Sequence, residues 1–263
     1  MDLGLAGKVA LVGASSKGLG RAIAEALAAE GASVAICARD AAVLNATRDA
    51  IAATAAAPVH AVAADLSRME GIGQVVRSTR DRFGRVDVLV TNNGGPPVGP
   101  LDSHDWATWQ RAVELTLRSA VELTRAVLPG MRERRWGRIL HVTSLTVKQP
   151  IDGLMLSTSI RAALTGFSRT LANEVAADGI TVNTILPGYM NTERVAELNQ
   201  ALATREGVPV QTVEQRVIGQ IPMHRIGEPR ELAALAAFLV SERASYITGQ
   251  SIVADGGWVR GLM

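Results

Sequence analysis

The sequence predicts a doubly wound α/β fold, in which helices cover both faces of a parallel sheet. Short apolar runs rich in valine and isoleucine alternate with longer helix-like stretches along the chain. Several of these runs are apolar on both faces, as fully buried strands of a parallel sheet require. Right-handed crossovers between successive strands then place the helices on the two faces.

The expected strands and helices follow from this alternation. The strands are Val9–Val12, Val34–Cys37, Val59–Ala63, Val86–Val90, Ile139–Val142, Ile180–Ile185 and Ser251–Val253. The helices are 18–30, 40–55, 67–83, 103–135, 157–178 and 228–241. Glycine follows four of the helices, where a left-handed cap suits it, at Gly31, Gly84, Gly137 and Gly179. No linker or repeat interrupts the series, so we expect residues 1–263 to form one domain.

One long stretch, residues 187–227, departs from the alternation after the strand that ends near Ile185. Within it, Glu193–Thr204 and Thr212–Gln220 have helical patterns. Ligands bind at the carboxyl ends of the strands in such sheets, so we expect this insertion to be a lid over a substrate site. A structural flap or an oligomer contact is the alternative.

The composition is that of a globular protein without a charge-driven partner. The 27 basic and 25 acidic residues leave a net charge of +2, and no basic run indicates a nucleic-acid surface. Cys37 is the only cysteine, so neither an internal disulfide nor a cysteine-based metal site is expected. The sequence shows no signal-peptide pattern and no apolar stretch near the roughly 18 residues of a membrane span. We therefore expect a cytoplasmic protein without a metal, a membrane or a nucleic acid as partner.

A glycine-rich turn joins the first strand to the first helix. It reads Gly13-Ala14-Ser15-Ser16-Lys17-Gly18-Leu19-Gly20. Glycines let the backbone approach a pyrophosphate, and the first N–H groups of the helix supply donors and a positive dipole end. Between the first strand and first helix of an alternating chain, such a turn predicts a dinucleotide site of the Rossmann type. The expected cofactor contacts here are Gly13, Ser15, Ser16, Lys17, Gly18, Leu19 and Gly20.

The end of the second strand selects the dinucleotide. An acidic side chain there suits the ribose 2′-hydroxyl of NAD(H), whereas arginine suits the 2′-phosphate of NADP(H). The strand ends in Ala38-Arg39, with no acid before Asp40, and Lys17 adds a second cation. Arginine matches phosphate with two parallel hydrogen bonds. We therefore expect NADP(H) as the cofactor, with a solvated surface role of Arg39 as the alternative.

Over nearly its whole length, the chain resembles the short-chain dehydrogenase/reductase family. The glycine turn is similar to the family's Thr-Gly-x-x-x-Gly-x-Gly motif, with Gly13 and Ala14 at its first two positions. Further motifs follow in the family's order: Asp65-Leu66, Thr91-Asn92-Asn93-Gly94, Pro187-Gly188 with Thr192, and Asp255-Gly256-Gly257. The resemblance implies that Asp65 and Leu66 lie at the adenine and that Asn92 and Gly94 also contact the cofactor. It further implies that Pro187, Gly188 and Thr192 lie at the nicotinamide carboxamide.

The resemblance also places four catalytic positions, and three of them hold other residue types here. Ser144 stands at the position of the serine that orients the substrate carbonyl. Ser157, thirteen residues on, stands in place of tyrosine, and Arg161 stands in place of lysine. Thr116 stands in place of asparagine. An aliphatic hydroxyl is a far weaker acid than a phenol, so Ser157 needs a neighbouring base to transfer a proton. Arg161 can still hold the cofactor ribose by hydrogen bonds.

Two other groups near the expected site could supply a proton. Tyr189 directly follows Pro187-Gly188 at the mouth of the site, and Lys148 lies between Ser144 and Ser157. The alternative roles are pocket lining for Tyr189 and a solvated loop position for Lys148.

Three functions are compatible with these residues. The first is an NADP(H)-dependent oxidoreductase acting on a carbonyl or alcohol group of a small molecule. The second is a non-catalytic dinucleotide-binding protein, and the third is an enzyme that runs non-redox chemistry on the same fold. Ser144 and the insertion favour catalysis, whereas the changed positions favour the other two. Because family members commonly pair through their long helices, the resemblance also implies a homodimer or homotetramer.

Overall fold

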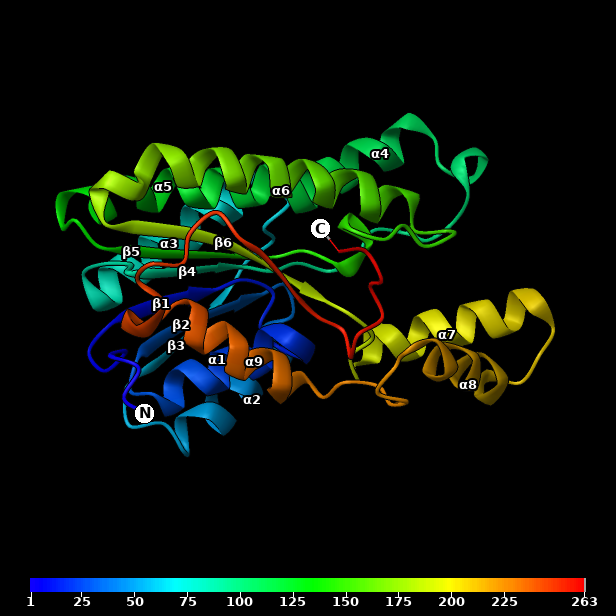
Figure 1. The fold of residues 1–263 in the computed structure, drawn as a ribbon. Coiled ribbons are helices and arrows are strands. Elements are labelled where there is room, and N and C mark those ends of the chain that lie inside the picture. Colours follow the sequence, from blue (N-terminus) through cyan, green and yellow to red (C-terminus); the bar gives the residue numbers. More distant parts are fainter. Residues whose placement is uncertain (263) are drawn as a thin grey trace.

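The computed structural model describes residues 1–262 and contains a seven-stranded sheet with the order β3-β2-β1-β4-β5-β6-β7 (Figure 1). The strands are β1 (Val9–Val12), β2 (Ser33–Ala38), β3 (Val59–Ala63), β4 (Val88–Thr91), β5 (Gly137–Val142), β6 (Ile180–Pro187) and β7 (Ser251–Ala254). The α-helices are α1 (Gly18–Ala29), α2 (Ala41–Ala52), α3 (Met69–Phe83), α4 (Trp106–Ala112), α5 (Ser119–Glu133), α6 (Met155–Val175), α7 (Glu193–Glu206), α8 (Val210–Gln220) and α9 (Pro229–Leu239). Every strand pairing is parallel, which confirms the predicted doubly wound sheet.

Alternate side chains of β1 enter two hydrophobic layers, one on each face of the sheet. Ala10 and Val12 join the layer formed with α1, α2 and α9. Leu11 joins the layer formed with α3, α5 and α6. All residues of β1, β4, β5 and β6 are buried, as expected of strands in a parallel sheet that is covered on both faces.

The strand order reverses between β1 and β4, and this reversal positions the site. From β1 the chain continues toward β2 and β3, whereas from β4 it continues toward β5, β6 and β7. The connections diverge and leave a crevice beyond the carboxyl ends of the two strands. Gly13 lies at this point, where its N–H donates to the carbonyl of Val90 at 2.9 Å. A Cβ on Gly13 would lie 2.8 Å from the carbonyl oxygen of Asn92, so only glycine allows this approach.

Two details differ from the sequence-based expectation. The single helix expected at 103–135 is divided into α4, a π-helical segment η2 (Val113–Arg118) and α5. Gly137 was expected to cap a helix but is the first residue of β5, and Arg135 takes the left-handed conformation instead, at φ 51°. Gly137 has a packing reason, because a Cβ there would lie 2.6 Å from Sδ of Met131. The other three glycines, Gly31, Gly84 and Gly179, do have positive φ.

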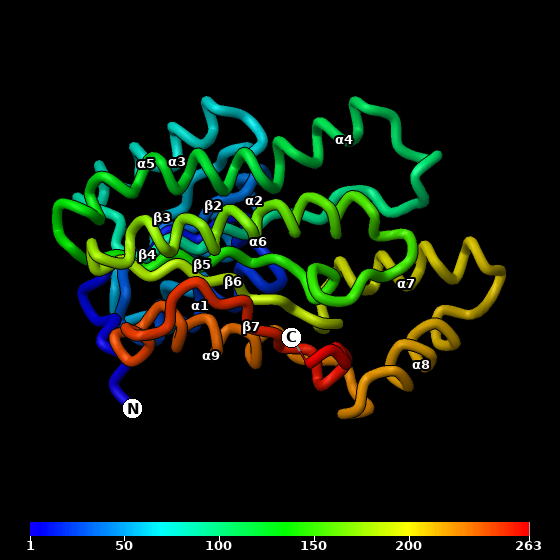
Figure 2. The backbone as a smooth tube through the Cα atoms, turned by 45° about the horizontal axis from the view of Figure 1, so that its top comes forward, coloured from blue at the N-terminus to red at the C-terminus, as the bar shows by residue number. Residues whose placement is uncertain are grey.

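The insertion forms a pair of helices, α7 and α8, that project beyond the carboxyl end of the sheet (Figures 1 and 2). Its two ends meet, because the N–H of Asn191 donates to the carbonyl of Gly227 at 2.8 Å. The N–H of Gly227 in turn donates to the carbonyl of Tyr189 at 3.0 Å. The insertion therefore leaves the rest of the fold and rejoins it at the same place, where its two ends are hydrogen-bonded to each other. None of the helices within residues 1–262 combines the length and apolarity that crossing a membrane demands.

Candidate functional site

The glycine turn is packed tightly but leaves the start of α1 open. Oγ of the buried Ser15 donates to the carbonyl of Val12 at 2.8 Å and accepts from the N–H of Cys37 at 3.0 Å. The Ser15 hydroxyl therefore joins β1 to β2. No side chain caps the first turn of α1, which begins at Gly18 after Lys17. Uncapped N–H groups at a helix start are a ready site for an anion.

On the β2 side of the crevice, Arg39 and Asp65 follow the ends of β2 and β3. Asp65 accepts hydrogen bonds from the backbone N–H and the hydroxyl of Ser67, at 2.9 and 2.8 Å. Although partial burial opposes it, these bonds and the nearby charge of Arg39 lower the pKa of Asp65. Arg39 is exposed, and within residues 1–262 it has no salt bridge. Its guanidinium is therefore available to a phosphate.

The segment after β4 carries two asparagines with different partners. Nδ2 of Asn92 donates to the carbonyl of Ala14 at 3.2 Å and so ties β4 to the glycine turn. Oδ1 of Asn93 lies 3.4 Å from both Oγ1 of Thr116, in η2, and Nη2 of Arg161. A Cβ placed on Gly94 would meet no atom within 4 Å, so open space lies beside this backbone.

Ser144 and Ser157 lie after β5 and in the first turn of α6. Oγ of Ser144 accepts from the N–H of Thr146 at 3.2 Å and from the Thr146 hydroxyl at 3.1 Å. Two donors toward the Ser144 oxygen leave its own hydrogen free for another acceptor. Oγ of Ser157 accepts from Nε of Arg161 at 3.2 Å, and its hydrogen is free in the same way.

Arg161 is buried and its guanidinium is largely committed to the protein. Nη1 donates to the carbonyls of Val142 and Thr143, at 2.9 and 3.0 Å. With the bonds from Nε to Ser157 and from Nη2 to Asn93, four of the five N–H donors are used. Burial, and secondarily the charge of Arg194, lowers the pKa of Arg161 to about 10. The side chain remains a cation at neutral pH with one donor to spare.

Tyr189 packs into a small apolar cluster with Leu145, Val217, Ile221 and Trp258. Its ring centroid lies 5.1 Å from that of Trp258. Burial raises the pKa of Tyr189, the opposite of what a proton donor at neutral pH requires. Among residues 1–262 its hydroxyl takes part in no hydrogen bond, so the structure favours the lining role.

The first turn of α7 lies over the crevice. Thr192 caps α7 and lies 3.7 Å from a Cβ built on Gly18. Glu193 forms an ion pair with Lys17, and the hydrogen bond and charge of Glu193 raise the pKa of Lys17. Lys17, expected beside the cofactor phosphate, is thus linked to the insertion. Behind them, the N–H of Gly188 donates to the carbonyl of Ala254 at 2.9 Å.

The crevice has the features that a dinucleotide requires. The uncapped start of α1 can take a diphosphate, the space beside Gly94 is open, and Arg39 has no competing ion pair among residues 1–262. The other residues expected at the cofactor lie on the same elements: Ser16, Leu19 and Gly20 in the turn and in α1, Leu66 after β3, and Pro187 at the end of β6. Sequence reasoning missed Asn93 and Arg194. Asn93 lies within the motif Thr91-Asn92-Asn93-Gly94, which could have indicated it, whereas Arg194 belongs to no motif.

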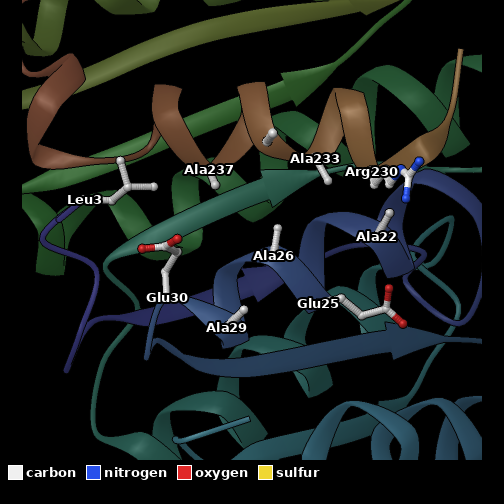
Figure 3. A pocket seen from close by; sticks show the side chains of 10 residues that line it. Leu3, Ala22, Glu25, Ala26, Ala29, Glu30, Arg230, Ala233 and Ala237 are labelled. Carbon is white, nitrogen blue, oxygen red and sulfur yellow. The ribbon is translucent and has the colours of Figure 1, made fainter. Parts of the chain in front are cut away.

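A groove of about 440 Å³ lies elsewhere, between α1 and α9 (Figure 3). Alanines of the two helices face each other across it, with Glu25 and Glu30 near α1 and Arg230 on α9. Its lining contains no hydroxyl, thiol or imidazole group. The side chains that could take part in catalysis therefore lie in the crevice beyond the carboxyl ends of β1 and β4 rather than in this groove.

The fold and the crevice define a dinucleotide-binding α/β protein. A family model described as Enoyl-(Acyl carrier protein) reductase matches residues 13–259. The 3-oxoacyl-(acyl-carrier-protein) reductase FabG of Vibrio cholerae is 36% identical over 257 residues, covering 97% of this chain and 98% of that protein. D-beta-hydroxybutyrate dehydrogenase of Cupriavidus necator is 35% identical, covering 97% and 99%. The structure of L-sorbose reductase from Gluconobacter frateurii, complexed with NADPH and L-sorbose, matches over the whole of both chains with 37% identity and a TM-score of 0.94. The chain belongs to the short-chain dehydrogenase/reductase family.

Proposed function

We propose that this protein is an NADP(H)-dependent oxidoreductase that interconverts a carbonyl and an alcohol group of a small molecule. The observation that carries the cofactor choice is Arg39, an exposed guanidinium at the end of β2 with no salt bridge among residues 1–262. It stands where a cofactor 2′-phosphate would lie. The NADPH in the similar L-sorbose reductase structure supports the same choice.

The residues around the crevice each have a part in holding the cofactor. The start of α1 binds the diphosphate, Arg39 binds the 2′-phosphate, and Asp65 and Leu66 flank the adenine. Asn92 and Gly94 line the middle of the crevice. Pro187, Gly188 and Thr192 flank the nicotinamide, and Arg161 has one N–H left for the ribose.

The catalytic set is Ser144, Ser157 and Arg161, an altered form of the family's relay in which Thr116 takes the asparagine position. Bound NADPH supplies the hydride. The free hydrogen of Ser144 orients the substrate carbonyl oxygen. Ser157 offers a second hydroxyl hydrogen, and the Arg161 cation beside it favours loss of that proton. Since an aliphatic hydroxyl is a far weaker acid than a phenol, proton transfer is slow.

Substrates that stabilise developing negative charge are therefore favoured. General acid catalysis typically contributes about 10²–10⁴-fold to the rate, which is the share at stake for a simple ketone. Quinones need this help least, because they spread the negative charge over a conjugated ring. Tyr189 and Lys148 are the alternative donors, and the packing of Tyr189 against Trp258 favours a lining role.

NADPH oxidation against a panel of ketones, aldehydes and quinones tests the proposal, together with direct NADPH binding by fluorescence. We expect tight NADPH binding, slow turnover of simple ketones and faster turnover of quinones. Binding without any turnover would favour a non-catalytic dinucleotide-binding protein or non-redox chemistry. The commitment of four Arg161 donors to protein acceptors is the observation that favours those functions.

We further propose that the insertion at 187–227 is a lid over the cofactor. The joined base at Met190 and Gly227 and the ion pair between Lys17 and Glu193 support this role. A homodimer or homotetramer acting in the cytoplasm is the expected working form, and light scattering measures the assembly.

A further inference from the structure

Arg194, the second residue of α7, crosses from the insertion to the segment that follows β4. Its Nη2 donates to the carbonyl of Pro96 at 2.8 Å. A Cβ placed on Gly95 would lie 3.0 Å from both Nε and Nη2 of Arg194. Gly95 does not have a positive φ, so glycine here leaves room for the guanidinium rather than serving a turn.

The first turn of α7 therefore touches both sides of the crevice. On one side, Thr192 lies against Gly18 and Glu193 is paired with Lys17, both at the start of α1. On the other side, Arg194 rests on Pro96. The Arg194 side chain is thus held close to the place where the start of α1 would bind a diphosphate.

The charges at this place are out of balance. Lys17 is matched by Glu193, but Arg161 has no salt bridge among residues 1–262. Arg194 has one carboxylate partner, Glu197, at 3.7 Å on the exposed side of α7. Both guanidinium groups contact the segment after β4, Arg161 at Asn93 and Arg194 at Pro96, and the charge of Arg194 acts on Arg161. An anion bound beside this segment would relieve their repulsion.

We propose that Arg194 binds the phosphate of NADP(H) that lies nearer the nicotinamide and so fastens α7 over the bound cofactor. This inference rests on the proposed function. The side of the crevice on which Arg194 lies identifies which of the two phosphates it would bind. Arg39 and Asp65 mark the adenine side after β2 and β3, whereas Arg194 rests on the segment after β4, toward Ser144 and Arg161. A guanidinium fork suits a phosphate, and the closed helix excludes water from the contact.

Binding of two probes tests this assignment without any turnover. NADPH has both phosphates of the diphosphate, whereas 2′,5′-ADP has the 2′-phosphate and only the adenine-side phosphate. Arg194→Gln should weaken NADPH binding by about 10- to 100-fold, as expected for one charge-assisted hydrogen bond. The affinity for 2′,5′-ADP should stay within about twofold. Arg216→Gln, the same charge change on α8, is the matched control and should alter neither affinity.

Gly95→Ala is a second variant that keeps the charge of Arg194 but crowds its guanidinium, and it should weaken NADPH binding in the same selective way but less than Arg194→Gln. Thermal unfolding confirms that each variant is folded. Unchanged NADPH affinity in Arg194→Gln overturns the inference. An unchanged affinity with a raised KM for acidic carbonyl substrates also overturns it, and assigns Arg194 to a substrate carboxylate. If the wild-type protein bound neither probe, the proposed function itself would fail.

Discussion

Nε of Arg161 donates a hydrogen bond to Oγ of Ser157, 3.2 Å away and one turn earlier on α6. The carbonyls of Val142 and Thr143 hold the other end of the guanidinium against the end of β5. The two side chains form a fixed pair rather than a mobile one. The pair places a hydroxyl beside a cation, the arrangement on which the proposed proton transfer depends.

Ser157→Tyr combined with Arg161→Lys should raise kcat on a simple ketone by about 10²–10⁴-fold, because the phenol is a far stronger acid than the serine hydroxyl. Steady-state kinetics with NADPH measures the gain, and the two single variants are the controls. A wild-type enzyme already fast on unactivated ketones would contradict the altered relay and point to Tyr189 or Lys148.

Arg39→Ala should weaken NADPH binding while leaving NADH binding nearly unchanged. Losing a charge-assisted contact to the 2′-phosphate costs about 1.5–3 kcal/mol, or roughly 10- to 150-fold in Kd. Fluorescence titration measures both constants. Arg77→Ala, another exposed arginine on α3, is the control. Equal weakening of both cofactors, or equal wild-type affinity for them, would show that Arg39 does not select the phosphate.

The insertion should gain hydrogen-exchange protection across 190–220 when NADPH binds, because α7 closes over the crevice. Glu193→Gln removes the ion pair with Lys17 and should lower protection of the first turn of α7 in the free protein. Exchange followed by mass spectrometry measures both effects. The strands β4 and β5 serve as an internal reference, since they are buried in either state. Equal protection of 190–220 with and without NADPH would argue against a lid.

Ala14→Gly should stabilise the protein. Ala14 has φ 44°, a left-handed conformation that costs a residue with a Cβ about 1–2 kcal/mol. Glycine removes this strain but makes the unfolded chain more flexible, so the net gain should be up to about 1 kcal/mol. Urea unfolding measures it. Ala50→Gly in the exposed part of α2 is the control and should have the opposite effect, a loss of about 0.5–1 kcal/mol.

Stability should fall as the pH drops below about 6.5, in part because of His141. This side chain is fully buried in β5, with Nδ1 2.7 Å from Oγ1 of Thr91. Burial lowers the pKa of His141 to about 3 from the ordinary 6.5, so the folded protein keeps the neutral form while the unfolded chain takes up a proton. The contribution is complete above pH 6.5 and is lost as the pH falls toward 3.

Unfolding by urea at pH 7 and pH 5 measures this dependence. The wild type should lose up to about 1.4 kcal/mol per pH unit more than His141→Gln. His60→Gln is the control, because His60 is only partly buried and its pKa is lowered by less than that of His141. A pH dependence unchanged in His141→Gln would mean that His141 does not contribute.

The sequence by itself determined the sheet, the crevice and the choice of cofactor. Runs that are apolar on both faces require burial on both faces, and their alternation with helices leaves few topologies. The glycine turn could be located because glycine alone permits the close approach seen at Gly13. Arg39 could be named because it follows the second strand directly. Each of these predictions depends only on residues that are close to one another in the sequence.

Tertiary structure decided the partners of the charged side chains. Lys17 meets Glu193, Arg161 meets the end of β5, and Arg194 meets Pro96, from segments far apart in the sequence. The capping role expected of Gly137 was wrong, because this residue begins β5 and packs against Met131 of α5. Periodicity records which face of an element is buried, but a long side chain can reach several partners. Which one it reaches depends on how the elements pack, and only the folded chain fixes that.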